Sequence, residues 1–205
     1  MPASRSAPPP QARKLPKQAR SGAMVEAILQ AAAELLDGGG ADDYTTNRIA
    51  ERAGASIGSL YQYFPSKDAI TAALIGQASA RLLAALELAA AQDDWRNALR
   101  AMVGAAVRHQ LERPGLARLL DANEARLAAL DGQRRDQQRM RELLAAVLRR
   151  VPDLAGQDAA GDDLMAITRA LCDAAGARGE VDAGALSGRV ERAIFGYLAW
   201  PRATE

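Results

Sequence analysis

Apolar residues recur every three or four positions along most of this chain, a spacing typical of helices with one buried face. The first such segment spans about residues 22–37, and the glycines at 38–40 end it because glycine adopts the left-handed cap conformation without steric cost. Two short helices are expected next, with a turn at Gly54 between them. Thr45 or Thr46 can cap the first, and Ser56 the second, by accepting a hydrogen bond from a free backbone amide.

Longer helices follow, and capping residues or prolines separate them. Ser66 is the expected cap of a helix that reaches about Ala91, and Asp93 or Asp94 caps one that ends near Arg113. The remaining expected helices cover about residues 114–121, a segment that begins between 123 and 131 and ends at 150, residues 162–176, and a last segment between 182 and 201. No segment has the pattern of a strand, so the chain is predicted to be all-α with about nine helices.

Residues 1–20 differ from the rest, because they combine proline, alanine, serine and basic residues with few large apolar side chains. This composition predicts a disordered arm. Its basic residues all precede the first acidic residue, Glu26; they are Arg5, Arg13, Lys14, Lys17 and Arg20. The arm is either a solvated tail or a segment that lies along DNA phosphates or in a minor groove.

Composition narrows the possible classes of function. Hydrophobic residues make up 49 % and aromatic residues 4 % of the 205 residues, which favours helices around an aliphatic core. The formal net charge is only +1, so the uneven distribution of basic residues is the informative feature. Cys172 is the only cysteine and His109 the only histidine, so neither a disulfide within the chain nor a usual zinc site is expected.

Several kinds of protein are not expected from the sequence. It contains no GxSxG motif, no phosphate-binding loop and no dinucleotide glycine pattern, so we expect no enzyme, no metal and no cofactor. We find no secretory signal and no run of 18 apolar residues, and we therefore expect no membrane association and a cytoplasmic location.

The segment from Thr45 to Lys67, TTNRIAERAGASIGSLYQYFPSK, has the form of a helix-turn-helix. In this motif the second helix enters the major groove of DNA while the first contacts the backbone. The outward positions of the second helix are small or polar, apart from Ile57 near its tip; they are Ser56, Gly58, Ser59, Gln62 and Tyr63.

These residue types suit contacts with DNA. Gly58 allows a close approach of backbones, and Gln62 can hydrogen-bond a base edge, with adenine its usual partner. Tyr61 and Tyr63 can donate to phosphates, and Lys67 stands at a helix N-terminus, where phosphates bind well. On the first helix, Thr46 and Arg48 are placed to meet the flanking backbone. The pattern alone also fits an ordinary helical bundle with exposed polar residues.

The segment from about Met24 to Ile75 resembles the N-terminal domain of the TetR family of transcriptional regulators. A helix that ends in glycines is followed by TTNRIAERAG and then by ASIGSLYQYFPSKDAI. The positions that match jointly are Thr45, Thr46, Ile49, Ala50, Ala53, Gly54, Gly58, Leu60, Tyr61, Phe64, Ser66 and Lys67. A joint match of this kind is far more specific than a single short motif.

The resemblance implies a DNA-binding role for particular residues, namely Thr46, Ser56, Gly58, Tyr61, Gln62, Tyr63 and Lys67. Two residues depart from the family pattern. Tyr63 stands where many members have histidine, and Ile57 stands where many have a basic or small polar residue. One contact with a phosphate or a base is therefore expected to be missing, although Ile57 can meet a thymine methyl group.

The resemblance divides the chain into a basic arm at 1–20, a three-helix DNA-binding domain at 21–66, and a larger helical domain at 67–205 that binds a ligand and dimerises. In the larger domain, Trp95, Met102 and His109 are spaced seven apart, with Leu99 and Ala106 beside them. They form either an ordinary core stripe, which is the default interpretation, or the wall of a pocket for a small apolar or amphipathic ligand of unknown identity.

The last two helices carry apolar stripes that can pair across a two-fold axis. Their members are Leu164, Ile167 and Leu171 on one helix, and Leu186, Val190, Ile194 and Tyr197 on the other. The alternative is that both stripes pack on the core of the same subunit. The resemblance favours a homodimer, because two reading heads must match two half-sites of DNA.

Taken together, these patterns predict a sequence-specific DNA-binding regulator. The resemblance implies a dimeric repressor on double-stranded DNA, at a palindromic operator, that a small molecule releases. The alternatives are a regulator that needs no ligand and a helical interaction module without a small-molecule effector.

Overall fold

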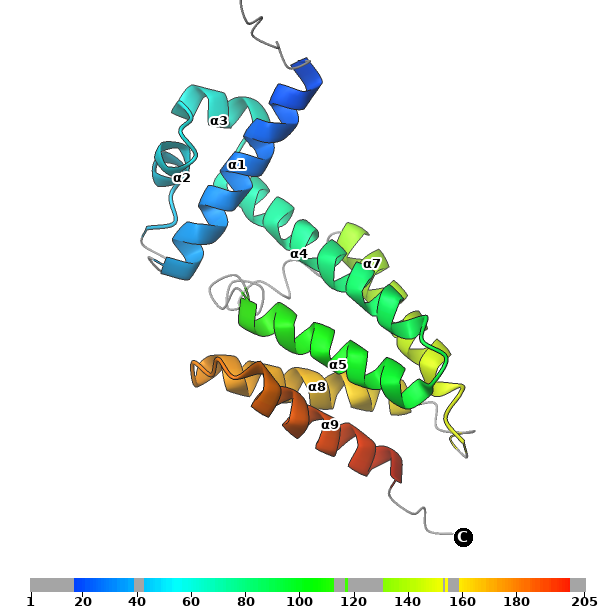
Figure 1. Cartoon of the computed structure of the whole chain (residues 1–205). Helices are drawn as coiled ribbons and strands as arrows, with labels where there is room; N and C mark the ends of the chain where they lie inside the picture. The colour runs from blue at the N-terminus through cyan, green and yellow to red at the C-terminus, as the bar shows by residue number, and fades with distance from the viewer. Residues whose placement is uncertain are drawn as a thin grey trace, which may run out of the picture.

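Every element in the described part of the chain is a helix (Figure 1). The computed structural model describes residues 17–38, 43–112, 117, 131–152, 154 and 159–199. Its eight helices within these ranges are α1 (Lys17–Gly38), α2 (Thr46–Arg52), α3 (Ile57–Tyr63), α4 (Lys67–Ala90), α5 (Trp95–Glu112), α7 (Asp131–Leu148), α8 (Ala160–Ala177) and α9 (Ala183–Ala199). The predicted all-α class is confirmed.

A small N-terminal unit forms around α1, which lies against both α2 and α4. Its core includes Ile28, Ile49, Leu60 and Ile70, each with no exposed surface. Each of α1, α2, α3 and α4 therefore contributes a fully buried residue to the same core. Burying large aliphatic side chains completely stabilises this arrangement by about 1.5–3 kcal/mol each.

A larger unit holds the remaining helices, with α4 and α5 antiparallel and with α8 and α9 forming a hairpin beside α5 (Figure 1). Its core includes Leu99, Val147, Leu186 and Val190. The first half of α4 packs into the N-terminal core through Leu74 and Ala78, and the second half packs into this one. One unbroken helix is thus shared by both cores, and the expected boundary at residue 66 falls just before it.

Side-chain caps fix most of the helix starts. Thr45 accepts from the amide of Arg48 (3.3 Å), Ser56 from that of Ser59 (3.1 Å) and Ser66 from that of Ala69 (3.2 Å). Asp94 and Asp182 cap α5 and α9 in the same way, at 2.8 and 2.9 Å. The predicted caps at Thr45, Ser56, Ser66 and Asp94 are confirmed, because a cap depends only on residues within one turn of the chain.

Two helix starts were predicted wrongly. α1 begins at Lys17, five residues before the expected start, because residues 17–20 are all good helix formers and continue the helix. α8 begins at Ala160 rather than at Asp162, and Ala159 provides no side-chain cap. Ala160, the first residue of the helix, is almost completely buried.

Some predictions concern residues that the structure does not describe. The arm before residue 17 lies outside the described ranges, and so does nearly all of the short helix expected at 114–121.

Within the described residues, α4 is long and apolar enough to cross a membrane by length and composition, with a mean hydropathy of 1.5. Gln77, Ser79 and Arg81 interrupt its apolar residues, so the helix reaches this mean hydropathy without containing an unbroken run of 18 apolar residues. In this fold α4 packs against α1, α5 and α7, so it serves as a helix of both cores.

Candidate nucleic-acid interface and internal cavity

The turn between α2 and α3 sets the orientation of the second helix of the motif. Gly54 has a φ of +65°, a conformation that costs glycine nothing and other residues about 1–2 kcal/mol. The Ser56 hydroxyl caps α3 and also lies 2.9 Å from the hydroxyl of Ser59. Leu60 and Phe64 are buried, and they hold the inner side of α3 against the core.

The opposite side of α3 faces solvent and carries no charge. Ser56, Gly58 and Gln62 are exposed, Ile57 is 39 % exposed and Tyr61 is 50 % exposed. Gln62 forms no hydrogen bond within the described part of the chain, so its amide is available to a base edge. Ile57 and Tyr61 are two of the few large apolar side chains that the described surface exposes.

Tyr61 and Tyr63 occupy different environments. The Tyr61 hydroxyl lies 3.3 Å from the hydroxyl of Thr46, so the two groups form one hydrogen-bonding site between α2 and α3. Tyr63 is half-buried and packs against the core of the N-terminal unit. A structural role for Tyr63 therefore accompanies any contact that its hydroxyl makes with DNA.

The two basic residues of the predicted interface, Arg48 and Lys67, both contact other side chains of the same chain. Arg48 lies 3.5 Å from Asp43 and 3.6 Å from Glu51, and these exposed pairs can exchange for a phosphate at little cost. The Lys67 ammonium lies 5.6 Å from the ring centroid of Tyr44. Burial raises the pKa of Tyr44, whose hydroxyl lies 2.9 Å from the Thr71 hydroxyl. Lys67 is exposed and positioned, as a phosphate contact requires.

Gly58 has no evident role within its own chain. A side chain added there would meet only the Ser56 hydroxyl, at 3.9 Å, and the backbone of Gly58 is ordinary helix. Glycine inside a helix costs about 1 kcal/mol relative to alanine. Because nothing in the described fold requires this glycine, its absence of a side chain favours close approach by another molecule.

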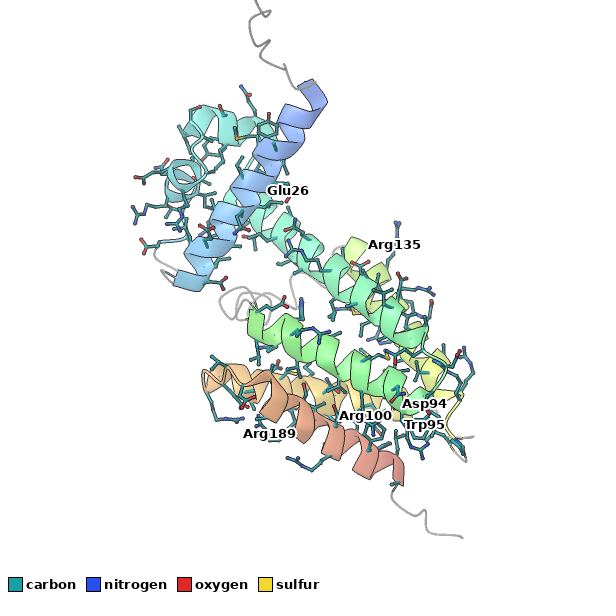
Figure 2. All side chains as sticks on the ribbon, in the orientation of Figure 1. Glu26, Asp94, Trp95, Arg100, Arg135 and Arg189 are labelled. Carbon is teal, nitrogen blue, oxygen red and sulfur yellow. The ribbon has the colours of Figure 1, made fainter. Side chains whose placement is uncertain are left out.

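A cavity of about 350 Å³ lies in the larger unit, among α4, α5, α7, α8 and α9. Four of the five residues predicted to face a ligand line it: Leu99, Met102, Ala106 and His109. Trp95 does not line it. Its ring packs 6.1 Å from that of Phe195 and lies 4.2 Å from the Arg96 guanidinium, at the other end of α5 (Figure 2).

Sequence patterns gave no sign of most of the cavity wall. Ser79 and Leu82 come from α4, Met140 comes from α7, and Thr168 and Cys172 come from α8. Helical spacing shows that each helix has a buried face, but it does not show which faces enclose a space. Burial lowers the pKa of His109, although Glu112 acts in the opposite direction, and burial raises the pKa of Cys172 to about 11. Both groups are therefore neutral near pH 7.

The stripes predicted to form a subunit interface are largely core instead. Leu164, Leu186, Val190 and Ile194 are at most 2 % exposed within a single chain, so they cannot also form its outer face. Ile167, Leu171 and Tyr197 are half-buried against the same core. The assignment of the four buried residues to an interface is corrected, because the spacing of apolar residues cannot distinguish a partner helix of the same chain from one of another chain.

No three histidine, cysteine, aspartate or glutamate side chains of the described residues gather as a metal site would require.

Comparisons with known proteins agree with this architecture. The family of bacterial regulatory proteins named after TetR matches residues 28–74, and a tetracyclin repressor-like C-terminal domain matches residues 94–198. A comparison with curated proteins finds no match.

Similar solved structures share the fold. A protein of unknown function from Rhodococcus sp. RHA1 is 22 % identical with a TM-score of 0.71, over 85 % of this chain and 93 % of that one. A TetR-family regulator from Streptomyces coelicolor is 22 % identical with a TM-score of 0.68, over 86 % and 95 % of the two chains. A TetR-family transcription regulator from Marinobacter aquaeolei VT8 is 20 % identical with a TM-score of 0.66, over 87 % and 97 %.

The two family matches together cover the helix-turn-helix and α5 to α9 of the larger unit, and the second match alone spans half of the chain. The chain therefore belongs to the TetR family of DNA-binding transcriptional regulators, which are not enzymes.

Proposed function

We propose that this regulator is a dimeric repressor that reads a palindromic operator and leaves it when a small apolar or amphipathic molecule enters the cavity. Repression rather than activation rests on what the family resemblance implies. A cytoplasmic location follows from a role on DNA.

The observation that carries this proposal is the course of α4. The helix begins at Lys67, directly after α3, and continues without a break to Ala90. Ser79, Leu82 and Leu86 of the same helix line the cavity. Leu82 follows Lys67 by fifteen positions, which is about 22 Å of helix at 1.5 Å per residue, so one continuous helix joins the cavity wall to the DNA-reading unit.

A ligand can act through α4 only if it prefers the conformation that does not fit DNA. A difference of 1–3 kcal/mol between the two conformations changes operator affinity about 5- to 150-fold. Movement of α4 would be transmitted to α1 as well, because Gln77 donates to Glu26 at 3.2 Å where the two helices cross (Figure 2).

We place the dimer interface on the outer faces of α8 and α9. The exposed positions there are mostly small, and they include Ala166, Ala170, Ala185, Gly196 and Ala199. A side chain added at Gly196 would meet nothing within 4 Å of its own chain. Small residues let helices from two subunits approach closely, and the resulting four-helix packing matches the two-fold symmetry of a palindrome.

The proposal is tested first by selecting bound sequences from random duplex DNA. A palindrome is expected, with affinity that falls with salt at a slope of about −0.9 per phosphate neutralised. A salt-independent response would contradict DNA reading, and an asymmetric single site would contradict the two-fold arrangement.

The ligand-release step is tested with the selected operator and Ala106→Trp, which fills the cavity. The variant should bind the operator as the parent does and should resist release by any small molecule that releases the parent. Ala145→Trp, at an exposed position of α7 outside the cavity wall and away from α8 and α9, is the control for a bulky substitution elsewhere. Release of both proteins by the same molecule at the same concentration would show that the cavity is not the effector site.

A further inference from the structure

The wall of the cavity carries an unbalanced negative charge. Its charged side chains are Asp136 on α7 and Arg169 and Asp173 on α8. The Arg169 guanidinium lies 3.5 Å from the Asp173 carboxylate one turn along α8, so these two charges compensate each other. Asp136 is half-buried and forms no hydrogen bond or ion pair with the described residues.

The arginines closest to Asp136 in sequence do not pair with it. Arg139, one turn along α7, lies 3.4 Å from Glu87 of α4 and 3.5 Å from Glu142. Arg141 lies 3.7 Å from Asp162. Arg135 is exposed near the start of α7 and is not part of the cavity wall (Figure 2). The described arginines of α7 therefore leave the charge of Asp136 uncompensated.

The other polar groups of the wall do not compensate it either. His109 is neutral near pH 7, because burial lowers its pKa. Gln110 and Thr168 are uncharged. Most of the remaining wall is aliphatic or methionine, including Leu82, Leu99 and Met140. The described wall thus combines an apolar body with one net negative charge at Asp136.

We propose that the cavity binds an amphipathic cation, such as an alkylamine or a quaternary ammonium compound, with the cationic group beside Asp136 and the apolar body against the leucines and methionines. The inference rests on the proposed function in taking this cavity as the effector site. A carboxylate partly withdrawn from water attracts a cation and repels an anion more strongly than it would in bulk solvent. Methionine side chains adapt to apolar bodies of different shape.

Three probes with the same alkyl chain and different head groups test the charge preference: decyltrimethylammonium, decanol and decanoate. Binding to the full chain is measured by calorimetry below the concentrations at which the probes form micelles. Decyltrimethylammonium should bind most tightly and decanoate most weakly. Added salt should weaken binding of the cation and leave that of decanol nearly unchanged.

Variants of Asp136 test its role. Asp136→Asn should weaken cation binding about tenfold, which corresponds to about 1.4 kcal/mol, and should leave decanol binding unchanged. Asp136→Lys should invert the order, so that decanoate binds more tightly than the cation. Asp93→Asn makes the same change of charge on the exposed loop between α4 and α5, outside the cavity wall, and should change nothing. Circular dichroism checks that each variant is folded.

The inference is overturned if decanoate or decanol binds the parent protein as tightly as the cation, if no probe binds, or if Asp136→Asn leaves the affinity for the cation unchanged. These outcomes are distinct from failure of the proposed function. If the cation binds at Asp136 but the operator complex is unaffected, the ligand class stands and the release mechanism fails. If decanol or decanoate releases the operator and the cation does not, the release mechanism stands and the ligand class fails.

Discussion

Gly58 is the residue whose identity the surrounding chain explains least. It occupies the second position of α3, where a methyl group would find open space and where alanine would favour the helix. The other exposed residues of α3 are uncharged, so the attraction to phosphates must come from outside this helix. We therefore expect close fit and hydrogen bonding, rather than charge, to determine what α3 reads.

Gly58→Ala should separate stability from DNA binding. The free energy of unfolding should rise by up to about 1 kcal/mol, because alanine favours the helix. The variant should therefore unfold at a higher temperature. It should bind the selected operator at least about tenfold more weakly, because the methyl group would meet the groove. Thermal unfolding and duplex titration measure the two effects. Gly76→Ala, at an open position in α4, is the control and should raise stability without a loss of affinity.

Gln62 and Lys67 should differ in the kind of binding that they support. Gln62→Ala should reduce discrimination between the operator and an unrelated duplex by about 1–3 kcal/mol, because a base contact is lost. Lys67→Ala should weaken binding to both duplexes alike and reduce the salt slope by about one. Titrations of both duplexes at several salt concentrations distinguish these outcomes. The reverse ranking would show that the groove-facing surface has been assigned wrongly.

The elements of the larger unit are joined by a few polar contacts at their ends. Arg150, just after α7, donates to the carbonyl oxygens of Ala90 (2.9 Å), Gln92 (2.5 Å) and Asp93 (3.4 Å). These carbonyls belong to the end of α4 and the turn before α5, where a helix leaves its last acceptors free. One side chain therefore joins the end of α7 to the end of α4 and to the turn before α5.

Arg150→Ala should lower the free energy of unfolding by about 1–2 kcal/mol, because charged hydrogen bonds to these carbonyls are lost at an exposed site. Arg150→Lys should recover only part of this loss, because an ammonium group cannot donate in the same fork. Urea unfolding of the three proteins measures the differences. Full recovery by lysine would indicate that charge alone, rather than the forked geometry, stabilises the turn.

The turn between α8 and α9 should be sensitive to acid. The Arg189 guanidinium, 2.6 Å from Glu180, lowers the pKa of this carboxyl, and Arg178 at 3.4 Å adds to the effect. The contribution to stability is fully present above the unfolded-state pKa of about 4.3 and is lost as the pH falls through the lower folded-state pKa. When the free energy of unfolding is measured from pH 7 to pH 2, it should fall less with acid in Glu180→Gln than in the parent protein. An identical pH dependence in both proteins would argue against this ion pair.

At the scale of the whole molecule, α4 connects the two hydrophobic cores, because it is part of both. Its first half belongs to the core that holds α3, and its second half belongs to the core that surrounds the cavity. The outer faces of α8 and α9 remain uncovered within a single chain, and small residues are spaced along them. Dimerisation on these faces would hold two copies of α3 at a fixed separation, which palindromic DNA requires.

Gly196→Arg should convert the protein into a monomer, because a long charged side chain would stand within the proposed interface. Its fold should persist, since the added side chain meets no atom of its own chain within 4 Å of the new Cβ. Sedimentation should show the dimer for the parent at micromolar concentration and the monomer for the variant, with weaker operator binding. Leu88→Arg, on the exposed side of α4, is the control for a surface arginine. A dimeric Gly196→Arg protein would remove α9 from the interface.

The sequence by itself determined the helices, the caps and the helix-turn-helix, because each depends on interactions within a few residues. Thr45, Ser56 and Ser66 cap their helices as predicted, and Gly54 has the positive φ that the turn requires. The starts of α1 and α8 were missed, because no capping side chain marks α8 and good helix formers extend α1.

Only the tertiary structure decided what each buried face meets. The spacing of Leu186, Val190 and Ile194 shows a buried stripe, but the fold shows that the stripe packs inside one chain. Asp136 gave no signal along the sequence, because the role proposed for it depends on a cavity lined by five helices and on arginines that pair elsewhere. The spacing of apolar residues indicates that a side chain is buried. The partner that covers it depends on contacts between residues far apart in the chain, which a local pattern does not contain.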